Sequence, residues 1–301
     1  MIQSRDTLFR SLLLVLMSLP LLARSDQPNT TPHIGILVPP IPAIFETPLR
    51  DSLRELGYVD GRTAIFDVRR SQASPQEFRA LADQLVQAKV DLIVAVSTPA
   101  ARAALEATTT IPVIFGVGDA VSTGIAQSLA RPPANGTGVT TMSTEVSAKR
   151  LEFVLELVPK ARRVAFLYNP SSALGPTMRE ETQKAAAARH VQLDLLEARD
   201  ARELDTALQK LSSKLPDGFL VSSEVLFLSG REHIIEVVKK ARLPTVFPWR
   251  LYAVEGGVVS YGASNEEAMR RMAIYVDKVL KGTKPSELPI EQMSVFNLVT
   301  T

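Results

Sequence analysis

The sequence predicts an α/β protein with two lobes, each built on a doubly wound parallel sheet. Near-continuous apolar runs of five or six residues recur along the chain, and longer amphipathic stretches lie between them. Such runs are typical of strands covered on both faces, and their alternation with helices indicates parallel strands. The chain has 301 residues, which is near the limit of one hydrophobic core, so two lobes are expected.

The expected strands are six apolar runs. They lie at residues 33–38, 92–97, 113–118, 164–169, 218–223 and 258–262. Three stripes of apolar residues at helical spacing predict helices around residues 78–86, 151–158 and 204–211. Ser74, Asp200, Ser229 and Ser264 are each followed by Glu three residues later, a pattern that marks the start of a helix, and Gly282 can end the last helix.

Residues 1–25 are expected to be a signal peptide. Arg5 and Arg10 precede an apolar run at 11–22 that is shorter than the roughly 20 residues a membrane span needs, and Ala23 and Ser25 suit a signal peptidase. A lipid anchor would need a cysteine at the cleavage site, and the chain has none. We therefore expect a periplasmic protein cleaved near Ser25, without a lipid anchor.

The lobe boundaries follow from interruptions of the pattern. Residues 131–144 are rich in Pro, Gly and Asn and form the predicted seam between the lobes, with a second seam after Gly262. The expected divisions are 26–140 plus 263–294 for the first lobe and 141–262 plus 295–301 for the second.

Composition excludes several classes of function. The 34 Lys and Arg residues nearly balance the 32 Asp and Glu residues, so the chain lacks the basic surplus that nucleic-acid binding requires. Without cysteine there is no thiolate metal site, iron–sulfur cluster or cysteine nucleophile. None of the three histidines lies at the carboxyl end of a predicted strand, and no nucleophile elbow or zinc motif occurs. We expect no cofactor and no metal.

Ligands of open α/β sheets bind beyond the carboxyl ends of the strands. Ser97, Thr98 and Pro99 follow one strand, where two hydroxyl residues and a proline begin a helix whose free N–H groups suit an anion. The same residues also fit a simple helix cap. Asp119 follows the next strand and could accept a ligand ammonium or only close a turn. The glycines before it do not complete G-x-G-x-x-G, so nucleotide binding is not expected.

The second half of the chain places further polar and aromatic residues at strand ends. Asn169, Glu224 and Phe227 follow two predicted strands, and Trp249 is the only tryptophan. Trp249 suits either a pocket wall or core packing.

Several short motifs in order resemble those of one family. They are IGIL at 34–37, LRELGYVDGR at 53–62, TPAA at 98–101, TTIPV at 109–113, SLARP at 128–132, NGTGV at 135–139, KRLE at 149–152, NP at 169–170, WR at 249–250, SYG at 260–262 and LKG at 280–282. The chain thus resembles the ABC transporter substrate-binding proteins, a family that includes binders of tryptophan and other aromatic amino acids. The resemblance implies a type I periplasmic-binding-protein fold, with three crossing segments and a ligand clamped between the lobes.

The resemblance also implies a set of ligand-binding residues. On the first lobe they are Pro40, Ser97, Thr98, Pro99 and Asp119, and on the second lobe Asn169, Glu224, Phe227, Trp249 and Tyr261. Two departures are notable. Relatives commonly carry Gly-Asp-Pro-Val where this chain has Gly118-Asp119-Ala120-Val121. Relatives also continue past the position of Leu298, whereas this sequence stops at Thr301, so we expect either a truncated sequence or an incomplete third crossing.

The expected function is a receptor, not an enzyme. The chain would bind a small polar ligand, an amino acid or related carboxylate, and would act as a monomer that docks on the membrane permease of an ABC transporter. One alternative is an exported enzyme that uses Asp119 and Glu224 across the cleft as acid and base. Another is a ligand-sensing partner of a membrane receptor.

Overall fold

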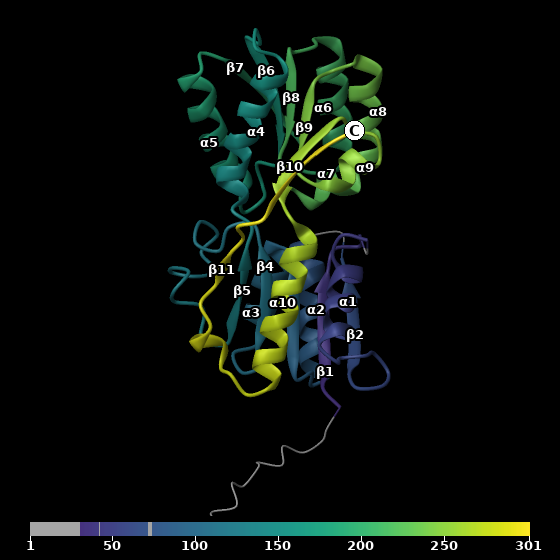
Figure 1. Cartoon of the computed structure of the whole chain (residues 1–301), viewed down its shortest axis with the longest axis vertical. Coiled ribbons are helices and arrows are strands. Elements are labelled where there is room, and N and C mark those ends of the chain that lie inside the picture. Colours follow the sequence, from purple (N-terminus) through teal and green to yellow (C-terminus); the bar gives the residue numbers. More distant parts are fainter. Residues whose placement is uncertain (1–30, 42, 72–73) are drawn as a thin grey trace, which may run out of the picture. The chain divides into compact units, whose positions relative to one another are not determined.

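Two six-stranded sheets form the framework of the protein (Figure 1). The computed structural model describes residues 31–41, 43–71 and 74–301, and the part from Pro32 onward forms one compact unit. The expected signal peptide lies outside the described residues. The predicted α/β fold class, with two doubly wound sheets, is confirmed.

The first sheet is parallel throughout, with strand order β11-β5-β4-β3-β1-β2. Its strands are β1 (His33–Val38), β2 (Ile65–Arg70), β3 (Leu92–Val96), β4 (Val113–Val117), β5 (Gly136–Thr140) and β11 (Glu291–Gln292). Helices α2 (Pro75–Gln87) and α3 (Thr98–Ala107) pack together, as do α1 (Glu46–Glu55) and α10 (Asn265–Leu280). Each pair buries its own side of the sheet, because alternate residues of β1 enter different core clusters: Ile36 lies with α1 and α10, and Leu37 with α2 and α3.

The second sheet has the order β12-β10-β9-β8-β6-β7, and only β12 runs antiparallel to its neighbour. Its strands are β6 (Arg163–Tyr168), β7 (Gln192–Glu197), β8 (Gly218–Val221), β9 (Thr245–Phe247), β10 (Val259–Ala263) and β12 (Phe296–Thr300). Residues of α4 (Ser143–Leu157) and α5 (Gly175–Ala188) share one core cluster with this sheet. Those of α6 (Ala201–Ser213), α7 (Val225–Ser229), α8 (Arg231–Ala241) and α9 (Arg250–Val254) share another.

Three segments carry the chain between elements of the two sheets: β5 to α4, β10 to α10, and β11 to β12. They are tied to each other by backbone hydrogen bonds. The Met293 N–H donates to the Thr140 carbonyl at 2.9 Å, and the Ser264 N–H donates to the Val295 carbonyl at 3.0 Å. A short 3₁₀ helix, η1 (Pro285–Glu287), precedes β11. The expected lobe boundaries at 140, 262 and 294 stay a prediction.

Helix starts follow the capping signals with one exception. The side chains of Ser74, Asp200 and Ser264 each accept a hydrogen bond from the N–H three residues later, and Gly282 follows the end of α10 with φ +100°. The expected cap at Ser229 is wrong. Ser229 is the last residue of α7, and α8 begins at Arg231 behind Gly230 without a side-chain cap.

The predicted seam at 131–144 contains a strand, β5, which the apolar runs do not predict. The five residues of β5 are fully buried between β4 and β11. A Cβ on Gly138 would lie 1.9 Å from the carbonyl oxygen of Phe115 on β4, so the glycine permits the close pairing that makes this segment a strand.

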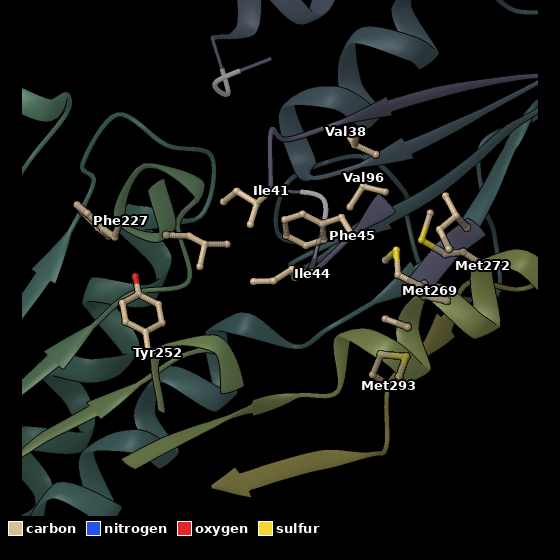
Figure 2. Packing of buried hydrophobic residues seen from close by; sticks show 14 of the residues in the cluster. Val38, Ile41, Ile44, Phe45, Val96, Phe227, Tyr252, Met269, Met272 and Met293 are labelled. Atoms are coloured by element: carbon tan, nitrogen blue, oxygen red, sulfur yellow. The ribbon is translucent and has the colours of Figure 1, made fainter. Parts of the chain in front are cut away.

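The turn after β1 carries apolar side chains between the two sheets. Figure 2 shows Ile41, Ile44 and Phe45 in the space between Phe227 and Val96, which belong to different halves of the chain. Among the described residues, no helix combines the length and the apolar character needed to span a membrane.

Candidate functional site

A cavity of about 800 Å³ lies at the carboxyl ends of strands from both sheets. From the first sheet it is lined by residues that follow β3 and β4, by Phe45 from the turn after β1, and by the first turns of α10. From the second sheet it is lined by the residues that follow β6, β8 and β9. This is where open α/β sheets bind ligands, and the volume suits a small molecule.

The first polar group of the cavity is the start of α3. Ser97, Thr98 and Pro99 all line it, and the Ser97 hydroxyl accepts a hydrogen bond from the Ala100 N–H at 3.4 Å. Ser97 has φ 102° and ψ 153°, a conformation that only glycine adopts without strain. Pro99 has no N–H, and the N–H groups of Ala100 and Ala101 already donate to Ser97. The first turn of α3 therefore offers the cavity the Thr98 N–H, the hydroxyl groups of Ser97 and Thr98, and the positive end of the helix dipole.

The second polar group is the loop after β6. Asn169 and Ser172 line the cavity, and the Asn169 side-chain oxygen accepts a hydrogen bond from the Ser171 N–H at 2.9 Å. The loop is tight because α5 begins with Gly175. A Cβ on Gly175 would lie 1.7 Å from the Asn169 carbonyl oxygen, so this close approach requires glycine.

The same loop holds the carboxyl group of Glu224, which also lines the cavity. Its Oε1 accepts a hydrogen bond of 2.6 Å from the Ser172 hydroxyl, which itself accepts from the Gly175 N–H at 2.8 Å. No Lys, Arg or His of the described residues pairs with Glu224. Glu224 is half-buried in the cavity wall. This burial raises the pKa of Glu224 to about 7, and the hydrogen bond from Ser172 opposes the rise.

Apolar side chains close the rest of the cavity. Phe45 and Met269 line it from the side of the first sheet, and Leu226 and Trp249 from the side of the second. The Trp249 ring is nearly parallel to that of Tyr252, at a centroid distance of 6.4 Å. The site therefore combines a polar region with an apolar wall, which suits a ligand that has both.

Six of the ten expected ligand-binding residues line this cavity, and four do not. Ser97, Thr98, Pro99, Asn169, Glu224 and Trp249 are brought together, whereas Pro40, Asp119, Phe227 and Tyr261 lie elsewhere.

The four residues outside the cavity contact other parts of the protein. Phe227 is fully buried in the core, and the Tyr261 ring packs between Phe153 and Phe296 at 4.7 and 6.0 Å. From the turn that holds Pro40, the cavity is instead reached by Phe45.

Asp119 closes a turn. Its carboxylate accepts hydrogen bonds from the N–H groups of Val121 and Ser122, at 3.1 and 3.0 Å, and from the Ser122 hydroxyl. It does not line the cavity, so the structure does not bring Asp119 and Glu224 together as an acid–base pair.

Charged side chains that sequence reasoning missed also line the cavity. Arg79, Arg102 and Glu106 come from α2 and α3, and Arg199 and Asp200 from the start of α6. Arg79, Arg102 and Glu106 lie on helices whose charges suggest only solvated faces. Arg199 and Asp200 directly precede α6, where the sequence indicates only a helix cap at Asp200. Among the described residues, no three His, Asp or Glu side chains are grouped as a metal site would require.

Two sheets of this topology around one shared cavity define the class of type I periplasmic binding proteins, and solved structures of that class share the fold. Residues 43–301 match the sequence profile of the family described as ABC transporter substrate binding protein. The chain belongs to this family.

The individual proteins that the chain resembles share about a quarter of its sequence. The chain is similar to a tyrosine-binding protein of Clostridioides difficile strain R20291, with 26% identity over 250 residues, which are 82% of this chain and 71% of that protein. A conserved domain protein of Vibrio cholerae has a similar structure, with a TM-score of 0.84 and 25% identity over 90% of this chain and 92% of that one. The structure of a Streptococcus pneumoniae ABC domain in complex with L-Trp is also similar. Its TM-score is 0.82, with 23% identity over 90% of this chain and 92% of that one.

Proposed function

We propose that this chain is the extracytoplasmic receptor of an ABC-type uptake transporter and that it binds an amino acid with an apolar side chain in the cavity between its sheets. The proposal includes export by residues 1–25, action as a monomer and docking on permease subunits in the membrane. The observation that supports it most is a single cavity that offers an anion site, an unpaired carboxyl and an apolar wall.

The carboxylate of the amino acid would meet the start of α3. The Thr98 N–H and the hydroxyl groups of Ser97 and Thr98 lie at this helix N-terminus and can donate to a carboxylate, which the positive end of the helix dipole also favours. This leaves the ammonium and the side chain for the other walls.

The ammonium would pair with Glu224. Ionisation of this half-buried carboxyl is disfavoured without a cationic partner, and a ligand ammonium supplies the missing charge. The apolar side chain would lie against Trp249, Phe45 and Leu226. Tyrosine and tryptophan, which two similar proteins bind according to their names, have this combination of groups.

Thermal denaturation of the protein spanning residues 26–301 tests the proposal. L-Tyrosine, L-tryptophan and L-leucine are compared with tryptamine, which lacks the carboxylate, and with indole-3-propionate, which lacks the amine. An amino acid at a hundredfold excess over its Kd should stabilise the protein by about 2.7 kcal/mol, which raises the Tm by about 5 °C.

The two analogues are the matched controls, since each lacks one of the charged groups that the cavity is proposed to hold. They should shift the Tm by much less than tryptophan does. A protein that folds but responds to no amino acid, or that responds equally to tryptophan and tryptamine, would contradict the proposal.

A further inference from the structure

Arg150, on α4, is a buried cation without a carboxylate partner among the described residues. Its side chain is 2% exposed, and no ion pair joins it to an Asp or Glu. Burial lowers the pKa of Arg150 to about 9, so the guanidinium remains charged at neutral pH. A buried charge without a partner lowers the stability of the folded protein, so a function of Arg150 is expected to offset this cost.

The guanidinium bridges the middle of β10 and the segment that follows β8. Its Nε–H donates to the carbonyl oxygen of Tyr261 on β10 at 2.8 Å, and Nη2 donates to the hydroxyl oxygen of Ser223 at 2.7 Å. Ser223 follows β8, and β9 lies between β8 and β10. Nη1 is buried without a hydrogen-bond partner among the described residues.

Ser223 connects this buried charge to the cavity, which it lines next to Glu224. A hydroxyl has one proton to donate, and its oxygen here already accepts a hydrogen bond from Arg150. Within the described part of the chain, Ser223 donates to no other group. Its proton is therefore free to face the cavity, and the adjacent positive charge makes the hydroxyl a stronger donor.

We propose that Arg150 is a positioning residue of the ligand site, which holds Ser223 so that its hydroxyl donates to an oxygen of the ligand, preferably a negatively charged one. The inference rests on the proposed function, because it needs a ligand in this cavity. It adds a hydrogen-bond donor from the second sheet and assigns Arg150 a role that acts through Ser223.

A thiol placed at this position tests the geometry without any ligand. The chain has no cysteine, so Ser223→Cys in the protein spanning residues 26–301 carries a unique thiol. A neighbouring guanidinium stabilises a thiolate, so the pH midpoint of its alkylation by iodoacetamide should lie below about 8.5, the value of a free cysteine. Burial alone would raise the midpoint instead.

Two further variants serve as controls. Adding Arg150→Met to Ser223→Cys should raise the midpoint of alkylation. Ser222→Cys should resist alkylation in the folded protein, because Ser222 is fully buried and outside the cavity. A thiol at position 223 that does not react, or whose midpoint lies at or above about 8.5, overturns the proposal even if the Arg150→Met variant does not fold.

A double-mutant cycle with L-tryptophan then separates positioning from a merely structural role. Ser223→Ala should weaken binding by about 10- to 100-fold, as the loss of a charged hydrogen bond predicts. Arg150→Met should weaken it comparably, and the double variant should bind like Ser223→Ala alone. Additive losses, or no loss in Ser223→Ala, overturn the proposal.

Failure of the wild type to bind any amino acid, with the thiol results as expected, would instead count against the proposed function.

Discussion

At the scale of single residues, Ser97 combines a strained backbone with a place in the cavity. A non-glycine residue in this conformation costs about 1–3 kcal/mol, and such residues cluster at ligand sites. Ser97→Gly should relieve the strain, while a glycine cap loses only a few tenths of a kcal/mol and a glycine backbone roughly 0.5–1 kcal/mol. We expect an unfolding free energy that is unchanged or slightly higher, with weaker amino-acid binding because the hydroxyl is lost.

Urea denaturation and calorimetric titration measure the two effects. Ser264→Gly is the control, because Ser264 caps α10 with an ordinary φ of −66° and does not line the cavity. That variant should be less stable than the wild type. If Ser97→Gly destabilises the protein as much as Ser264→Gly does, the backbone at Ser97 stores no strain.

Glu224 should make amino-acid binding depend on pH. The pKa of its carboxyl is raised to about 7, so the protein without ligand holds a proton there below that pH. An ammonium binds the carboxylate form, so this proton must be released before binding. The affinity should therefore fall as the pH drops below about 7, by at most about tenfold per unit, and should be constant above it.

Calorimetric titration with L-tryptophan at several pH values between about 5.5 and 8 measures this dependence, over a range in which the charges of the ligand itself do not change. Glu224→Gln should bind weakly at every pH, because it cannot ionise. A wild-type affinity that rises as the pH falls, or a variant that keeps the wild-type profile, would show that the ammonium binds elsewhere.

At the scale of elements, the loop between β6 and α5 depends on one glycine. Alanine normally favours a helix over glycine, but a Cβ at Gly175 would collide with the backbone of Asn169. Gly175→Ala should therefore destabilise the protein by about 1–3 kcal/mol and weaken ligand binding, since Asn169 and Ser172 must move.

Denaturation and titration again separate the two effects. Ala187→Gly on the same helix is the control. Ala187 is exposed in the last turn of α5, so the change should cost less than about 1 kcal/mol and leave binding intact. A Gly175→Ala protein that is more stable than the wild type would mean that the loop has room for a Cβ at this position.

Elements differ in how well the sequence predicts them. Strands such as β1 and β3 are buried along their length and appear as continuous apolar runs. The edge strands β2 and β7 are half-buried and carry charged residues, so they have no such signal. The sequence predicts a seam around β5 because Pro, Gly and Asn interrupt the apolar pattern there, and burial between β4 and β11 makes the segment a strand.

At the scale of the whole molecule, the topology predicts the place of the cavity. It does not predict as well which side chains line that cavity. Strand order brings the ends of β3, β6, β8 and β9 to one cavity. The residues within three positions after these strands include Ser97, Asn169, Glu224 and Trp249, and all four line the cavity. The direction of a side chain at such an end depends on local turns. For this reason Asp119 turns to its own loop and Phe227 to the core.

The apolar wall gives a prediction at the same scale. Trp249→Ala should weaken binding of tyrosine or tryptophan by about tenfold or more, because it removes a large apolar surface from the cavity. His233→Ala should leave binding unchanged, since His233 is exposed on α8 and contacts Asp205. Equal effects of the two changes on the Kd would place the ligand elsewhere.

The central claim, that an amino acid binds in this cavity, is tested most directly by the fluorescence of Trp249. It is the only tryptophan of the chain, so light absorbed by tryptophan but hardly by tyrosine excites this residue alone. We predict that titration with L-tyrosine changes its emission saturably, and that Glu224→Gln loses the change at pH 8. Tyrosine binding detected by calorimetry without any change in this emission would contradict the account.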